Sequence, residues 1–178
     1  VPLYFVVISA FKDNIGIFDS PLLPPTSFSF DNFVNAWQTV TLGPALWNSV
    51  LVTGISELLT LALALPAGYA IARSKGRLGR VFERIFALGF LIPSFAALVP
   101  TLLLSIFLGL YHTTFFLAFF LTATSLPISV IMMADFMRTI PAELEESAMI
   151  DGASRWKILR HVYAPLARAG IVLIVILN

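Results

Sequence analysis

Residues 140–170 read IPAELEESAMIDGASRWKILRHVYAPLARAG, a polar segment that lies between two apolar stretches of the chain. Four acidic residues come first and four basic residues follow, so the charges of the segment balance. They are Glu143, Glu145, Glu146 and Asp151, then Arg155, Lys157, Arg160 and Arg168. We interpret the segment as a helix, a glycine break and a second helix, held at a membrane surface to bind another protein.

The composition of the chain is typical of a membrane protein. Of its 178 residues, 58% are hydrophobic and 12% are charged, and the mean hydropathy is +0.92. A soluble domain carries about 25% charged residues. The net charge of +1 arises from basic residues spread among apolar runs, which does not predict nucleic-acid binding. Because the chain has no cysteine, disulfides and thiolate metal sites are excluded.

Apolar runs predict three complete membrane spans and two partial ones. Their expected bounds are about 1–11 (partial), 45–72, 85–110, 115–137 and 171–178 (partial). A spanning helix needs about 20 residues, so we expect a fragment of a longer membrane protein, truncated at both ends. A signal peptide is the alternative for the first run, although no basic region precedes it.

The distribution of Lys and Arg predicts the orientation of these spans. Residues 73–84 and 138–168 hold ten of the eleven basic residues, whereas residues 12–44 and 111–114 hold only Lys12. Short cytoplasmic loops carry an excess of Lys and Arg. We therefore expect 139–170 to be cytoplasmic and 12–44 to be an extracytoplasmic loop, with a short helix at about 30–39.

The first half of the polar segment has helix-end signals. Pro141 suits the first helical turn, and Thr139 is a candidate cap. Three glutamates follow in the early turns, where the helix dipole favours negative charge. Gly152 is expected to end this helix, because glycine adopts the left-handed conformation that closes one.

The second half predicts another helix that leads back into the membrane. Ser154 is a candidate cap, and we expect Trp156, Leu159 and Tyr163 to share one side. Pro165 is expected to stop or kink this helix. On periodicity alone, an amphipathic helix lying among lipid headgroups is an equal alternative to a protein-binding element.

The spacing within the segment resembles the EAA loop of ABC-importer permeases. The pattern of that loop is Glu-Ala-Ala, a glycine four residues later, then an apolar residue and Leu-Pro. Here Glu146-Ser147-Ala148 takes the first place and Gly152 the second. Ser147 stands where alanine is usual, and Ala164 precedes Pro165 where leucine is usual.

Further segments resemble carbohydrate-uptake permeases similar to the smaller membrane subunit of the maltose transporter. They are Phe11-Lys12, Asp31-Asn32-Phe33, Asn48-Ser49, Gly68–Arg73 and Ile140–Glu146, which together span nearly the whole chain. The resemblance implies an all-α membrane protein, a polytopic helical bundle of the type I ABC importer permease kind, truncated at both ends.

The resemblance also implies a function and a set of partners. The chain would be a permease subunit of an ATP-driven importer for a sugar, in a bacterial or archaeal cytoplasmic (inner) membrane that it crosses several times. It would work with a second permease, ABC ATPase subunits and an extracytoplasmic solute-binding protein, surrounded by membrane lipid. The cytoplasmic helix at 141–150 would insert into a cleft on an ATPase subunit and couple it to alternating access.

The residues implied for ATPase docking are Leu144, Glu145, Glu146, Ser147, Ala148, Asp151, Gly152, Ala153 and Pro165. The chain contains neither a GxxxxGK[ST] phosphate loop nor an HExxH motif. We therefore expect no catalysis by this chain and no cofactor bound to it, with ATP and magnesium on the partner ATPase.

Glu57 is the acidic residue placed deep in a predicted span, where an unpaired charge is costly. It is a candidate for the substrate pathway, or it pairs with a residue of the missing helices or the partner permease. Asp135 is expected to pair with Arg138 or with a neighbouring cation, and His112 and His161 are expected to be surface residues. Two further functions remain open: a permease for another solute, such as a polyamine, glycerol phosphate or peptide, and a membrane scaffold or channel that binds a partner other than an ATPase.

Overall fold

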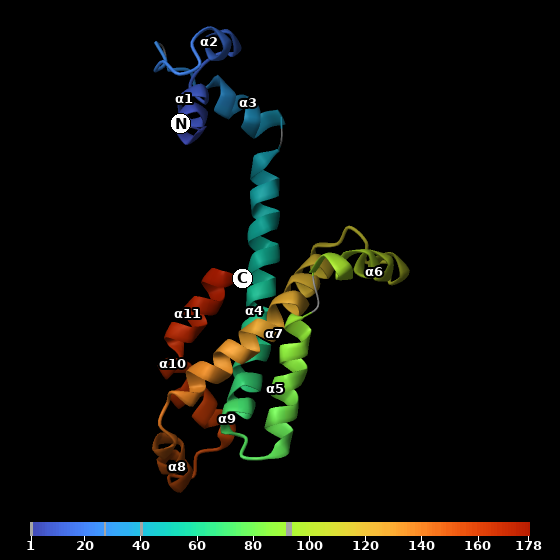
Figure 1. Ribbon diagram of the computed structural model, residues 1–178, viewed down its shortest axis with the longest axis vertical. Helices are drawn as coiled ribbons and strands as arrows, with labels where there is room; N and C mark the ends of the chain where they lie inside the picture. The colour runs from blue at the N-terminus through green and yellow to red at the C-terminus, as the bar shows by residue number, and fades with distance from the viewer. Residues whose placement is uncertain (1, 27, 40, 92–93) are drawn as a thin grey trace. The chain divides into compact units, whose positions relative to one another are not determined.

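The computed structural model describes residues 2–26, 28–39, 41–91 and 94–178, and every regular element in these ranges is a helix (Figure 1). The chain divides into two compact units, Val1–Val50 and Leu51–Asn178, which are described separately below. The predicted all-α fold class is confirmed.

Among its described residues, the first unit contains three short helices before residue 41. They are α1 (Pro2–Ser9), α2 (Asn14–Asp19) and α3 (Asp31–Thr39), and α3 matches the helix expected at 30–39. The side-chain amide of Asn32 donates hydrogen bonds to the carbonyl oxygens of Ala10 (3.1 Å) and Lys12 (2.6 Å). The ring of Phe11 lies 5.3 Å from that of Phe33, centroid to centroid. Two segments that share the family resemblance, 11–12 and 31–33, therefore contact each other.

Among the described residues, two helices are long and apolar enough to cross a membrane, and a third candidate is a bent pair. The two are α4 (Leu42–Arg73, 32 residues) and α7 (Thr114–Arg138, 25 residues), which match the spans expected at 45–72 and 115–137. The bent pair consists of Arg155–Leu166 and Arg168–Leu177, with an angle of 72° between its halves. At 1.5 Å per residue, α4 is about 48 Å long, which exceeds the ~30 Å thickness of the hydrocarbon core of a bilayer.

The span expected at 85–110 contains two helices instead of one. They are α5 (Arg77–Phe90) and α6 (Ser94–Phe107), and Pro93 lies between them in the sequence. The helix α5 also begins earlier than expected, because its first turns mix arginines with apolar residues at helical spacing. A search for uninterrupted apolar sequence does not detect such an amphipathic start.

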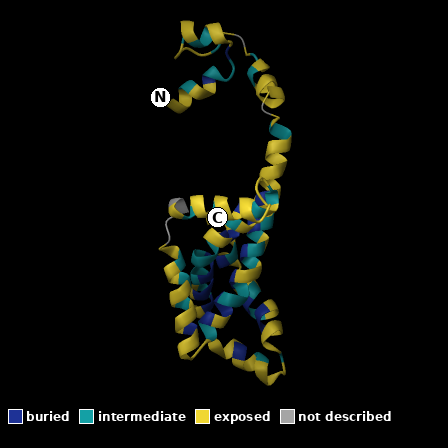
Figure 2. Ribbon diagram, turned by 90° about the vertical axis from the view of Figure 1, so that its right-hand side faces the viewer, coloured by how far each residue is buried: buried dark blue, intermediate teal, exposed yellow. Residues whose placement is uncertain are grey.

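Close helix packing in the second unit depends on small residues. A Cβ atom added to Gly68 of α4 would lie 2.8 Å from Cγ of Met133 and 3.1 Å from the backbone nitrogen of Ala134, both in α7. Glycine thus lets the two helices approach closely, as small residues do between membrane helices. Figure 2 shows the buried residues of this unit on the inner sides of its helices and the exposed residues outside.

An ion pair joins α5 to α7 near the end of α7. Arg138 contacts Glu83 of α5 (Nη2 to Oε2, 2.7 Å) and Asp135 of its own helix (Nη1 to Oδ1, 2.8 Å). The expected pairing of Asp135 with Arg138 is confirmed.

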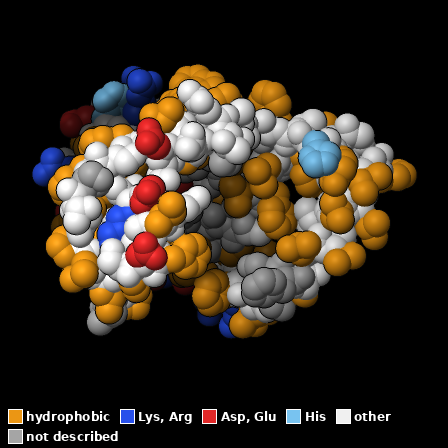
Figure 3. All heavy atoms as spheres, turned by 90° about the horizontal axis from the view of Figure 1, so that it is seen from above, with side chains coloured by type: hydrophobic (Ala, Val, Ile, Leu, Met, Phe, Trp, Pro, Cys, Tyr) orange, Lys and Arg blue, Asp and Glu red, His pale blue; other side chains and the backbone are white. Residues whose placement is uncertain are grey.

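Large apolar side chains such as Leu58 (71% exposed) and Phe107 (86% exposed) lie at the surface, and Figure 3 shows hydrophobic side chains over much of the face in view.

Candidate functional site

The polar segment begins with helix α8 (Ala142–Ile150). Pro141 precedes it with an extended backbone (φ −55°, ψ 135°), and no side chain of the described residues caps the helix. The expectation that Thr139 caps it is wrong. Thr139 instead ends α7, where its hydroxyl donates a hydrogen bond to the Phe136 carbonyl (2.7 Å), because the two residues between Thr139 and α8 place it too far back along the chain.

Gly152 closes α8 as expected. Its φ of +79° is in the left-handed region, and its N–H donates to the carbonyl of Met149 (3.0 Å). The next N–H, of Ala153, donates to the carbonyl of Ala148 (3.0 Å). This is the six-to-one bond of a Schellman ending, in which a left-handed residue satisfies the last carbonyls of a helix.

The second half of the segment is helical but irregular. It contains α9 (Arg155–Ile158), a π-helical turn η1 (Leu159–Tyr163), α10 (Ala164–Leu166) and α11 (Arg168–Leu177). The hydroxyl of Ser154 accepts a hydrogen bond from the Lys157 N–H (3.4 Å), which confirms the expected cap. Pro165 lies in the last turn before the 72° bend, so a kink near this proline is confirmed.

The side of this segment that faces inward differs in part from expectation. Leu159 and Tyr163 are buried, but Trp156 is 65% exposed and Ile158 occupies an inward position in its place. The prediction that Trp156, Leu159 and Tyr163 share one side assumed regular α-helical spacing. A π-helical turn begins at Leu159, and its larger number of residues per turn breaks that spacing.

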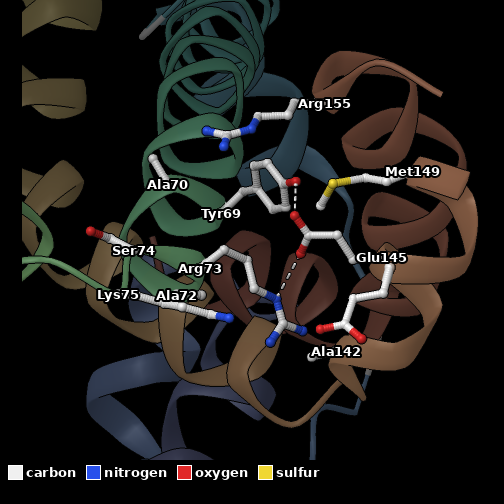
Figure 4. Close-up of a pocket in the computed structure, with 11 residues that line it drawn as sticks. Tyr69, Ala70, Ala72, Arg73, Ser74, Lys75, Ala142, Glu145, Met149 and Arg155 are labelled. Carbon is white, nitrogen blue, oxygen red and sulfur yellow. Dashed lines mark hydrogen bonds and ion pairs between the residues drawn. The ribbon is translucent and has the colours of Figure 1, made fainter. Parts of the chain in front are cut away.

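Glu145 of α8 is the centre of a buried polar cluster. Its side chain points from α8 toward α4, and the residue is only 8% exposed (Figure 4). The carboxylate oxygen Oε1 accepts a hydrogen bond from the Tyr69 hydroxyl (2.7 Å), and Oε2 accepts one from the Tyr163 hydroxyl (3.0 Å). Hydrogen bonds to a charged group contribute about 1.5–3 kcal/mol each.

Arg73 completes this group, which we call the Glu145 cluster (Tyr69, Arg73, Glu145 and Tyr163). Its Nε lies 3.3 Å from Oε2 of Glu145, within ion-pair distance although not aligned for a hydrogen bond. Its Nη2 donates to the carbonyls of Met137 (3.2 Å) and Ile140 (2.5 Å), at the end of α7. A cation is favourable at this end of a helix because the dipole is negative there.

The Glu145 cluster thus joins four elements: α4, the end of α7, α8 and η1. The aromatic rings also contact each other, with the centroids of Tyr69 and Tyr163 4.9 Å apart, and the Arg73 guanidinium carbon lies 4.9 Å from the Tyr163 ring centroid. Sequence reasoning missed Tyr69, Arg73 and Tyr163 as site residues. The available signal was the four-residue spacing of Tyr69 and Arg73, which places both on one face of a helix.

The other residues expected at a docking surface lie mostly on the outside of α8 and its turn. Leu144, Glu146, Ser147, Asp151, Gly152 and Pro165 are exposed, whereas Ala148 and Ala153 are half-buried. Two further apolar side chains, Met149 (45% exposed) and Ile150 (87% exposed), extend this surface although they were not predicted. The structure therefore separates Glu145, which faces inward, from the remaining expected residues.

A cleft of about 810 Å³ opens beside the Glu145 cluster, between the end of α4 and α8. Lys75 and Arg155 line it together with Glu146 and Met149, and Figure 4 shows Arg155 reaching from the α9 side toward α4. Both signs of charge thus meet at the cytoplasmic end expected for these helices.

Glu57 lies half-buried in α4. Its Oε2 accepts a hydrogen bond from the side-chain amide of Asn178 (3.4 Å), and its buried Oε1 has no hydrogen-bond partner in the part of the chain that the structure describes. Among the residues that the structure describes, no cation pairs with this carboxylate, and no group of His, Asp or Glu is arranged to hold a metal ion.

Comparison with known proteins decides the family. The family described as "Binding-protein-dependent transport system inner membrane component" matches residues 64–178, which include α8 and the whole Glu145 cluster. The chain belongs to this family. The resemblance to ABC-importer permeases is therefore confirmed, and the apolar helices agree with a multi-pass membrane protein.

The chain is similar in sequence to several named transport proteins. It is 32% identical over its full length to a diacetylchitobiose uptake system permease protein of Streptomyces coelicolor, covering 59% of that protein. It is 31% identical over 94% of its length to a melibiose/raffinose/stachyose import permease protein of Bacillus subtilis, covering 61% of it. The chain thus spans about three fifths of the length of the curated relatives it matches.

A solved structure shares the fold. It is a crystal structure of a bacterial ABC transporter involved in the import of the acidic polysaccharide alginate, which matches 99% of this chain and 62% of the matched chain. The TM-score is 0.82 and the sequence identity 25%. These relatives are transport permeases, which agrees with the expected class of transport subunit.

Proposed function

We propose that this chain is a permease subunit of an ATP-driven ABC importer for a sugar. The observation that carries the proposal is α8, whose outer surface is exposed and whose EAA-like spacing ends in a left-handed Gly152, in a chain that belongs to a transport permease family. The names of relatives support a sugar as the solute, since they include permeases for diacetylchitobiose and for melibiose, raffinose and stachyose.

In this proposal α8 inserts into a cleft on an ABC ATPase subunit, which binds ATP and magnesium. The exposed side chains of Leu144, Glu146, Ser147, Met149 and Ile150 supply a mixed apolar and acidic surface for that contact. Closure of the ATPase dimer would move α8, and the helices would alternate between inward-facing and outward-facing states. This chain itself performs no chemical step.

The remaining partners follow from the same proposal. A second permease subunit would complete the pathway, and an extracytoplasmic binding protein would deliver the solute, in a bacterial or archaeal cytoplasmic membrane. The many exposed apolar side chains of the second unit support lipid and a neighbouring membrane subunit as its surroundings.

We also place Glu57 on the substrate pathway. Its buried Oε1 has no described hydrogen-bond partner, so the carboxylate has capacity to bind a hydroxyl group of a sugar. The variant Glu57→Gln separates this role from pairing with another helix. A changed apparent KM for uptake with normal assembly supports a pathway role, whereas poor assembly with an unchanged KM supports structural pairing.

A crosslinking experiment tests the docking of α8. These 178 residues contain no cysteine, so a Ser147→Cys variant of the full-length permease, with any cysteine outside them replaced by serine, can be assembled with its ATPase and crosslinked in membranes. We expect a crosslink to the ATPase, and none from Tyr111→Cys in the turn between α6 and α7, whose residue is also exposed. Equal crosslinking of both variants, or of neither, would refute docking through α8.

Uptake measurements test the class of solute. The assembled transporter in liposomes would be supplied in turn with melibiose, raffinose and diacetylchitobiose, and with a polyamine as a solute of another class. We expect ATP-dependent uptake of at least one sugar and none of the polyamine. Uptake that is indifferent to ATP would instead support a channel.

A further inference from the structure

The Glu145 cluster differs in its contacts from the exposed surface of α8 that lies next to it. Glu145 and Glu146 are neighbours on α8, but Glu145 is 8% exposed and Glu146 is exposed. Both carboxylate oxygens of Glu145 already accept hydrogen bonds within this chain. A partner protein would have to break these contacts to reach Glu145, so this residue is suited to hold α8 in place and not to bind the partner.

The chemistry of the Glu145 cluster indicates that it fixes the position of α8 more than it stabilises the fold. A buried ion pair loses its hydration, and well-packed apolar residues of similar size often stabilise a fold equally well. Its hydrogen bonds, however, require fixed directions and distances from each partner. The Glu145 carboxylate can be satisfied only while α8 keeps its place relative to Tyr69 on α4 and Tyr163 on η1.

Arg73 extends this constraint to a third direction. Its guanidinium donates to two carbonyls at the end of α7 while its Nε remains 3.3 Å from the Glu145 carboxylate. A movement of α8 away from α4 would leave buried charges without partners, which is costly in a low-dielectric environment. We propose that the Glu145 cluster is a rigid joint that makes the end of α4 follow α8, with Glu145 as its positioning residue.

The joint is placed where it can transmit movement into the membrane-spanning helices. Tyr69 and Arg73 belong to α4, and Gly68 directly beside them contacts Met133 of α7. Tyr163 lies before the bend that leads into α11. A displacement of α8 is thus applied to three helices at once. This inference rests on the proposed docking of α8 to an ATPase.

The variant Glu145→Gln tests the joint with little change in shape. It removes the negative charge that pairs with Arg73, and an amide nitrogen replaces one of the two hydrogen-bond acceptors. The matched control is Glu143→Gln, an exposed glutamate of the same helix that lies outside the cluster and the docking set. Both would be made in the full-length permease, assembled with its ATPase and partner permease in liposomes, and the measured quantity is solute transported per ATP hydrolysed.

We expect Glu145→Gln to lower this ratio at least about fivefold, the lower end of the usual range for coupling between sites. The control should keep the ratio of the unaltered transporter. The Ser147→Cys crosslink to the ATPase should persist in Glu145→Gln, because docking uses the outer surface of α8. An unchanged ratio with the crosslink retained would overturn the joint alone, and loss of the crosslink would show that Glu145 shapes the docking surface instead.

A distance measurement separates a joint from a merely structural residue. Spin labels at Ser74 and Ala142, which are both exposed and line the cleft from the end of α4 and from α8, report the separation of these two helices. We expect one narrow distance distribution with and without ATP in the unaltered transporter, and a broader one in Glu145→Gln. A distribution that is equally narrow in the variant, or that shifts with ATP in the unaltered transporter, would overturn a rigid joint.

A milder variant keeps the test decisive if Glu145→Gln does not assemble. Tyr163→Phe removes one hydrogen bond and leaves the contacts of Tyr69 and Arg73 with the carboxylate. It should lower the transport ratio in the same direction, and an unchanged ratio would count against the joint. Absence of the Ser147→Cys crosslink in the unaltered background would instead refute the proposed docking itself.

Discussion

The left-handed conformation of Gly152 can be tested apart from its small size. A Cβ atom added to Gly152 meets no described atom within 4 Å, so alanine fits sterically within this chain. The cost of Gly152→Ala then arises from the backbone, because φ is +79°. For an L-residue this conformation costs about 1–2 kcal/mol. Asparagine tolerates the conformation better and should cost less.

This penalty falls on the end of α8 and not on the membrane-spanning helices. A cost of 1–2 kcal/mol raises the population of an unravelled end by a factor of about 5–30. Gly152→Pro should be more severe, because proline fixes φ near −65° and removes the N–H that donates to Met149. The expected order of impairment is Asn, then Ala, then Pro.

Two assays decide between conformation and contact. Hydrogen exchange of the backbone amides at 148–154 measures fraying of α8, and ATP-driven uptake in liposomes measures function. We expect faster exchange and weaker uptake to change together across Gly152→Asn, Gly152→Ala and Gly152→Pro. If Asn and Ala impaired uptake equally without altering exchange, the partner would require a residue without a side chain, and the conformational reasoning would be refuted.

Three further predictions concern helix contacts away from α8. The hydrogen bond from Arg138 holds the pKa of the Glu83 carboxyl below its usual range, so the stability it contributes is present above its unfolded pKa of about 4.3 and is lost as pH falls through the folded value. Thermal unfolding in detergent should therefore show Glu83→Gln less stable at neutral pH, by under about 1 kcal/mol for this partly exposed pair, and equal to the unaltered protein in acid. Gly68→Val should cost about 1–3 kcal/mol by forcing α4 and α7 apart, whereas Gly54→Val, whose Cβ meets nothing within 4 Å, should cost much less in the same unfolding assay. Asn32→Ala should lose about 1–3 kcal/mol of local stability by leaving two carbonyls of the first unit without their donor, and faster proteolysis within residues 12–44 would reveal it.

Local features of the chain could be predicted from sequence, because neighbouring residues determine them. The glycine that closes α8 and the serine that caps α9 act within one turn, and both expectations are confirmed. The long apolar runs of α4 and α7 were likewise recognisable from composition. The amphipathic start of α5 was not, since its arginines interrupt the apolar pattern while its helical spacing continues.

The inward direction of Glu145 could not be predicted in this way. Its partner Tyr69 is 76 residues away along the chain, and the short helix α8 has acidic residues on more than one side. Sequence alone therefore gave no basis for separating Glu145 from Glu146. The resemblance grouped both as docking residues, whereas only contacts between distant segments show that one carboxylate is occupied within the chain.

Ser147 and Ala164 depart from the usual EAA-loop pattern, and residues 68–73 explain why these two departures need not weaken the joint. This short stretch contains the glycine that lets α4 approach α7, and Tyr69 and Arg73 that hold the Glu145 carboxylate. Ser147 is exposed and Ala164 is half-buried, and neither belongs to the Glu145 cluster. A change at Ser147 therefore alters the surface presented to a partner, while the position of α8 is set by contacts on its opposite side. In the proposed mechanism, affinity for the ATPase and transmission of its movement would then vary independently.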